Sequence, residues 1–201
     1  MPLIKYNNQS LSSITALPAS IPTGKLKLIS SQTASNSASI SFTSGLNSTY
    51  KVYRFVFVNI HPRSDNFHFT FNMSTDGGSN YNVTKTSTAF VTYHREADDD
   101  AGITYDGGFD LAQSTSFQPF QQNWGNGADE SGSGDLILFN PASTTYVKHF
   151  ISRCNNYHAG DYSIDCFNAG YFNTTSAVNA IRFQMSSGNF DGTIYLYAIE
   201  S

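Results

Sequence analysis

Apolar and polar residues alternate with a period of two along much of this chain, and no other sequence feature constrains its fold as strongly. The clearest case is the segment 67–73, FHFTFNM, in which every second residue is phenylalanine or methionine and the residues between them are polar. Successive side chains of a strand point to opposite faces of a sheet, so this segment is predicted to be a half-buried strand. No stretch of about a dozen residues has the period of an amphipathic helix.

Ten short segments of this kind are separated by turn residues, which favours an all-β chain folded as an antiparallel β-sandwich or jelly roll of about ten strands. The Gly-rich segment 75–80 predicts a hairpin-type turn, and 187–192 predicts another turn, because glycine supplies the positive φ that such turns need. In chain order, the predicted strands are 25–29, 39–42, 53–58, 67–73, 86–93, 135–139, 146–154, 162–167, 180–185 and 193–199.

The first 24 residues do not show this alternation. They contain Pro2, Pro18 and Pro22, half of the 6 prolines of the chain, and each of these removes a backbone donor and favours extended or turn geometry. We therefore expect residues 1–24 to form an extended N-terminal arm that anchors the protein in an assembly. Residues 25–201 are then one β-sandwich domain, within the size range of about 100–200 residues for a single domain.

The charge balance excludes several classes of protein. Lys and Arg number 11 against 15 Asp and Glu, and this net charge of −4 disfavours a nucleic-acid partner. No run approaches the ~20 apolar residues of a membrane span. Residues 1–8 lack the apolar centre of a secretory signal, so we expect synthesis in a cytoplasm.

The segment 96–134 breaks the strand pattern, since it is acidic and rich in glycine. We expect long loops here, at one end of the sandwich or over one sheet. Asp98, Asp100 and Asp106 are candidate calcium ligands, because calcium takes six to eight oxygen ligands. The EF-hand pattern is absent, and a solvated acidic loop is the other interpretation. No other cofactor is expected.

Two cysteines and two histidines, His149, Cys154, His158 and Cys166, raise the question of a zinc site. No Cys-x2-Cys pair is present, and residues five apart on a strand face opposite sides of the sheet, so His149 and Cys154 are not expected to share a metal. Two buried free thiols are the favoured interpretation. A disulfide between Cys154 and Cys166 stays open.

The only tryptophan lies in the segment 121–126, QQNWGN. Sugar sites stack an aromatic ring on the apolar face of a sugar and surround it with amide and carboxylate groups. Trp124, Asn123 and Asn126 are therefore candidate ligand-binding residues of a carbohydrate-binding module. A core position or an oligomer contact is the other interpretation of Trp124.

No sequence motif indicates an enzyme, and no catalytic residues are assigned. The patterns G-x-S-x-G, H-E-x-x-H and the P-loop are all absent. Acidic residues within 96–135 leave a polysaccharide depolymerase as an alternative, since glycoside hydrolysis uses two carboxylates, but nothing in the sequence selects a pair.

Four longer segments carry a family resemblance: 74–86, 110–115, 138–150 and 185–194. Together with the start MPLIKYNN, they resemble virion structural proteins of aquatic tailed phages, the cyanophage-type β-rich tail-fibre or capsid-associated proteins. The likeness runs over nearly the whole chain. It implies a non-enzymatic particle protein without a cofactor, and it assigns no binding residues.

We therefore expect a virion protein, made in the host cytoplasm and exposed on the particle. A tail-associated fibre or adhesin that contacts glycans of the host surface is favoured, and a capsid decoration protein that stabilises the shell is the alternative. Its partners would be other virion proteins, bound through the arm, and sister copies in a homotrimer. Neither a nucleic acid nor a membrane span is expected.

Overall fold

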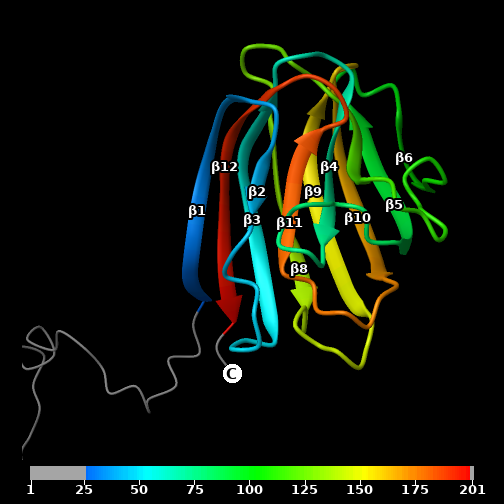
Figure 1. Ribbon diagram of the computed structural model, residues 1–201. Helices are drawn as coiled ribbons and strands as arrows, with labels where there is room; N and C mark the ends of the chain where they lie inside the picture. The colour runs from blue at the N-terminus through cyan, green and yellow to red at the C-terminus, as the bar shows by residue number, and fades with distance from the viewer. Residues whose placement is uncertain (1–25, 200–201) are drawn as a thin grey trace, which may run out of the picture.

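The computed structural model describes residues 26–199, and the predicted arm, residues 1–24, lies outside them (Figure 1). No helix in the described residues is long and apolar enough to cross a membrane. The regular elements are the strands β1 (Leu26–Ser37), β2 (Ile40–Phe42), β3 (Val52–Pro62), β4 (Phe67–Ser74), β5 (Lys85–Arg95), β6 (Ala101–Tyr105), β7 (Gln118–Trp124), β8 (Gly132–Phe139), β9 (Lys148–His158), β10 (Tyr162–Phe172), β11 (Ala180–Met185) and β12 (Phe190–Ile199).

All strand pairs are antiparallel, and they fall into two runs. The long run has the order β1-β12-β3-β8-β9-β10-β5-β6, and the short run has the order β2-β11-β4-β7. A single residue pair, Trp124 of β7 with His158 of β9, joins the two runs into one sheet. Its two end strands approach each other, since Gln32 Nε2 of β1 donates to the carbonyl oxygen of Ser41 of β2 at 2.8 Å, so the sheet is nearly closed on itself. The predicted all-β, antiparallel class is confirmed, whereas the predicted sandwich or jelly roll of about ten strands is not.

Aromatic rings fill the space between the two runs. The ring centres of Phe57 on β3 and Phe183 on β11 lie 5.3 Å apart, and those of Phe71 on β4 and Phe150 on β9 are equally close at 5.3 Å. All four side chains are buried. Because burying one such side chain contributes about 1.5–3 kcal/mol, these facing rings contribute several kcal/mol to holding the runs together.

Side-chain amides complete the junction between β7 and the long run. Nδ2 of Asn168 on β10 donates to the carbonyl oxygen of Phe120 at 2.8 Å, and Nδ2 of Asn156 on β9 donates to that of Gln122 at 3.3 Å. Both asparagines are buried. The amides thus take the place of ladder hydrogen bonds on the side of β7 that faces β9 and β10, where buried carbonyl oxygens need a donor.

The substitution Asn168→Asp tests this junction, because it replaces the donating amide by an acceptor of the same shape. We expect it to lower the free energy of unfolding by about 1–3 kcal/mol at neutral pH, since two acceptors would face each other in the interior. Urea denaturation measures the loss. Asn126→Asp makes the same chemical change at an exposed position and should have little effect; equal effects at both sites would contradict the junction.

All ten predicted strands coincide at least in part with observed ones, but the predicted loop region 96–134 is corrected. It contains two strands that the sequence pattern did not indicate, β6 and β7, together with the start of β8. β6 has five residues that are all exposed, so it has no buried face to create an alternation. In β7, polar Gln side chains and Pro119 occupy strand positions and hide the pattern.

The predicted hairpin at 75–80 is also corrected. Gly77 and Gly78 do adopt positive φ, 74° and 94°. However, β4 pairs with β7 and β11, while β5 pairs with β6 and β10, so the turn carries the chain from the short run to the long run. The turn at 187–192 does the same between β11 and β12.

Candidate functional site

The side of the long run that points away from the core, here called the outer face, carries most of the exposed large apolar side chains. Within residues 26–199, nine such side chains are exposed. One, Tyr146, lies in the connection between β8 and β9, and the other eight lie on strands of the long run. Their restriction to one face makes that face the candidate contact surface of the chain. These eight are Leu26, Leu28, Val58, Phe90, Ile103, Tyr105, Ile151 and Ile199.

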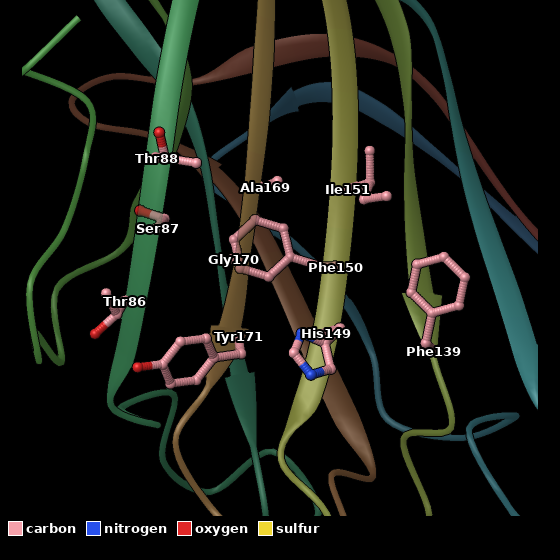
Figure 2. Close-up of a pocket in the computed structure, with 10 residues that line it drawn as sticks. All are labelled: Thr86, Ser87, Thr88, Phe139, His149, Phe150, Ile151, Ala169, Gly170 and Tyr171. Atoms are coloured by element: carbon pink, nitrogen blue, oxygen red, sulfur yellow. The ribbon is translucent and has the colours of Figure 1, made fainter.

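A hollow of about 580 Å³ opens on this face over β8, β9, β10 and β5 (Figure 2). Ala169 and Gly170 give it a low floor, because neither carries a large side chain. The rings of His149 and Tyr171 lie together at one end, with their centres 6.0 Å apart. The remaining lining residues are Thr86, Ser87, Thr88, Phe139, Phe150 and Ile151.

The three hydroxyl groups from β5 that line this hollow are engaged with the protein itself, that of Thr88 with the Tyr105 hydroxyl. Ser87 Oγ donates to Gln118 Oε1 at 2.6 Å and accepts from the backbone N–H of Leu111 at 3.0 Å. Thr86 Oγ1 accepts from Gln113 Nε2 at 2.9 Å. Since these groups are already paired, the hollow offers mainly rings and aliphatic carbon, which fits an apolar side chain of another protein better than a sugar.

The charges on the outer face are paired with each other. Arg54 Nε lies 2.7 Å from Asp135 Oδ2, and Arg153 NH2 lies 2.6 Å from Asp165 Oδ2. Hydrogen bonding to Asp165 raises the pKa of Arg153 further above its usual value. The Arg153 guanidinium also lies 4.9 Å from the centre of the Phe167 ring. The face therefore combines apolar surface with charges that are locally neutralised.

Comparison with protein-family models, with curated proteins and with solved structures finds no match to this chain. What it does must therefore be argued from its own residues.

Trp124 does not lie where a sugar could stack on it. Only 1% of its surface is exposed, and its ring packs in the core 5.6 Å from the ring of Phe69. Asn126 is exposed in the following loop. Asn123 is half-buried, and its backbone N–H donates to His68 Nδ1 at 3.2 Å. The structure does not bring these three side chains together around a ligand, and the interpretation of Trp124 as a core residue fits its position.

The three candidate calcium ligands lie apart. Asp98 precedes β6 and pairs with His94 at 2.9 Å, whereas Asp106 follows β6 and accepts from the backbone N–H of Gly108 at 3.0 Å. Asp100 accepts from the Tyr162 hydroxyl at 3.1 Å. In the described part of the chain, no three His, Cys, Asp or Glu side chains gather closely enough to hold a metal ion.

The cysteines and His149 lie on opposite sides of the long run, as the strand spacing predicts. His149 is exposed on the outer face, and Cys154 is buried. Cys154 lies directly opposite Cys166 in the β9–β10 register, and both are free thiols. Burial raises the pKa of Cys166 to about 12 and that of Cys154 well above its usual value.

Both thiols are therefore expected to resist modification in the folded protein. The thiolate is the reactive species, so at about pH 8 a buried thiol with a raised pKa is almost entirely protonated and unreactive. We expect no reaction with DTNB in native buffer and reaction of two thiols per chain in denaturant. Rapid reaction of the native protein would contradict the buried placement, and an absence of thiols after unfolding would indicate a Cys154–Cys166 disulfide.

Proposed function

We propose that this chain is a non-enzymatic structural protein of a phage virion, exposed on the particle as a tail-associated fibre or adhesin component that contacts the host surface. The observation that carries the proposal is the outer face, an apolar surface of the kind by which subunits associate. In this proposal the two facing runs of strands act as the two layers of a sandwich.

The resemblance to virion proteins supports the same function. All four of its segments fall on connections between strands: 74–86, 138–150 and 185–194 span one each, and 110–115 lies inside the connection between β6 and β7. Such connections vary more freely than core strands, so a likeness that falls on them favours a shared role over a shared core.

We take the occupant of the outer face to be a sister copy of this chain. The eight strands have 5 to 12 residues each and lie about 4.8 Å apart, which gives a curved face of roughly 1,200 Å². The ~800 Å² per partner of a stable interface is about two thirds of that face, so one neighbour needs to cover only part of it. Within one copy, the charge of Arg54 is neutralised by Asp135 and that of Arg153 by Asp165. Like copies can therefore approach without strong repulsion, and a closed trimer is the assembly that we propose.

The decisive experiment is a localised cryo-EM reconstruction of the intact particle, which would show where the chain lies and in how many copies. A small number of copies on the tail, in contact with each other through the outer face, would support the proposal. Hundreds of copies on the icosahedral shell would overturn the tail role in favour of capsid decoration.

The arm, residues 1–24, is proposed to anchor the subunit to its virion partners, although it lies outside the described residues. Deletion of these residues is the test. If the shortened protein enters particles as well as the full chain does, the anchoring role is wrong.

A further inference from the structure

A second, smaller hollow lies apart from the one on the outer face. Its volume is about 260 Å³. Its floor is formed by Val91 and Ile164, which are buried and belong with Cys166 to a small apolar cluster separate from the main core. Five of the lining side chains, including Val91 and Ile164, come from β5, β9 and β10. One comes from β7, and Asp100 lies in the connection before β6. The other lining residues are Tyr93, Asp100, Gln122, His158 and Tyr162.

The walls of this hollow are aromatic. Tyr162 lies at the centre of the group, with its ring 6.2 Å from that of Tyr93 and 5.6 Å from that of His158. Both contacts are edge-to-face, so the three rings present different faces and edges. Pockets for drug-sized ligands have about 300–1,000 Å³, so this slightly smaller hollow fits one ring of a ligand and not more.

The polar groups around the rings are oriented by hydrogen bonds within the protein and keep further donors and acceptors for a ligand. The Tyr162 hydroxyl donates to Asp100 Oδ2 at 3.1 Å, which orients the carboxylate and leaves its second oxygen available. The backbone N–H of Gly160 donates to His158 Nδ1 at 2.9 Å, so a neutral imidazole carries its proton on Nε2. Burial lowers the pKa of His158 and favours this neutral form. Gln122 contributes a half-buried side-chain amide.

We propose that this hollow binds one neutral pyranose unit of a glycan. The rings supply apolar surface for the C–H face of the sugar. Its hydroxyl groups both donate and accept, which matches a carboxylate oxygen of Asp100, the Nε2–H of His158 and the two-sided amide of Gln122. The negative charge of Asp100 at the rim disfavours sugars that carry a carboxylate or sulfate group.

A quaternary ammonium ligand is the main competitor, since aromatic rings beside a carboxylate also attract cations. Two observations disfavour it. The Arg95 guanidinium already lies 5.6 Å from the centre of the Tyr162 ring, which places a positive charge against that ring. The donors of His158 and Gln122 also need acceptors, and a quaternary ammonium group has none.

This inference rests on the proposed attachment function for the source of the glycan, a host surface. Binding itself is measured on the isolated full chain, so the two can fail separately. A tail position of the chain without sugar binding would support the function and contradict this site. Sugar binding by a protein of the shell would support the site and contradict the tail function.

The experiment is calorimetric or NMR titration of the full chain with methyl glycosides of glucose, galactose and mannose. The test variants are Asp100→Asn and Gln122→Ala. Asp110→Asn is the matched control, because Asp110 also accepts from a tyrosine hydroxyl, that of Tyr105 at 2.6 Å, but does not line the hollow. Removing the charged acceptor of Asp100 should weaken binding about ten-fold or more, and removing the neutral amide of Gln122 should weaken it about two- to ten-fold.

Binding of at least one of the three sugars, weakened in both test variants and unchanged in the control, would support the site. Three results would overturn it. The first is that none of the sugars binds at millimolar concentration. The second is that the test variants bind as the parent protein does. The third is that tetramethylammonium binds more tightly than the sugars, which would assign the hollow to a cation.

Discussion

Trp124→Ala is expected to lower the free energy of unfolding by about 3–5 kcal/mol, the usual loss for truncating a large aromatic side chain in a core. The indole lies at the junction of the two runs, packed against Phe69 and directly over Gly132. A Cβ at Gly132 would collide with the indole ring, so the indole lies tightly against the backbone of β8 at Gly132. Because glycine has no side chain, it cannot fill the cavity that the alanine variant would leave. Its loss should therefore weaken the contact between β7 and the long run.

The measurement is urea denaturation followed by fluorescence, because Trp124 is the only tryptophan of the chain. The parent protein should emit at short wavelength when folded, as a buried indole does, and shift to long wavelength on unfolding. The alanine variant is followed by circular dichroism. Trp124→Phe should cost less than Trp124→Ala, and Asn126→Ala, in the exposed loop, should cost almost nothing. An alanine variant as stable as the parent protein would mean that the indole does not fill the core.

Strands with one clear alternation could be predicted from sequence, while the strands that close the sheet could not. The segment 67–73 was predicted to have one buried and one polar face, but β4 is buried on both sides from Phe69 to Ser74. The buried Asn72 side chain is satisfied there, because its Nδ2 donates to the carbonyl oxygens of Tyr81 and Thr115. Thr115 lies 43 residues from Asn72 in the sequence. The alternation shows where a strand lies, but long-range hydrogen bonds decide which polar residues are buried.

The pairing of strands could not be predicted from the sequence, because it also depends on long-range contacts. A Gly-rich turn shows that the chain reverses, and Gly77 and Gly78 have the predicted positive φ. It does not show whether the next strand pairs with the previous one or crosses to the other run. β7 is the extreme case, since side-chain amides of Asn156 and Asn168 meet two of its carbonyl oxygens in place of a backbone ladder.

The segment 121–126, predicted from sequence to bind a sugar, contributes one residue to the site that we propose, but not through its ring. Gln122 lines the smaller hollow, whereas Trp124 points into the core. The rings that surround that hollow come from β5, β9 and β10, which only the fold brings together. The exposed apolar side chains of the outer face are visible in the sequence pattern. The segment 53–58 is apolar on both faces apart from Arg54, and side chains such as Val58 are therefore left exposed.

The stability of the protein is expected to rise between about pH 6.5 and pH 8.5, because Lys85 is buried without a carboxylate partner. Its side chain is fully buried at the start of β5. Nζ donates to the carbonyl oxygen of Ser116 and lies 5.5 Å from the centre of the Phe172 ring. Within residues 26–199 no ion pair includes Lys85. Burial therefore lowers the pKa of Lys85 to about 7 from a usual value of 10.5.

The direction of the effect follows from proton binding. The unfolded state keeps the lysine protonated up to about pH 10, while the folded state releases this proton near pH 7, so the unfolded state binds more protons in between. The free energy of unfolding then rises with pH in that window. The full shift in pKa corresponds to on the order of 5 kcal/mol, of which about 2 kcal/mol falls between pH 6.5 and pH 8.5. Above this range the thiols, with the pKa of Cys166 raised to about 12, oppose the rise.

The variant Lys85→Met separates this charge from everything else that titrates, since methionine is unbranched, of similar length and neutral. Its absolute stability also reflects the lost hydrogen bond to Ser116, so the informative quantity is the slope of stability against pH. We expect urea denaturation to show most of the rise in the parent protein and in Lys51→Met, an exposed lysine, and a much flatter profile in Lys85→Met. The small remaining slope would come from Lys148 and from the two histidines His68 and His158, because burial lowers the pKa of all three. Equal slopes in the parent protein and Lys85→Met would show that the buried amine stays charged throughout, and that the carbonyl of Ser116 and the ring of Phe172 suffice to hold an ammonium group inside the fold.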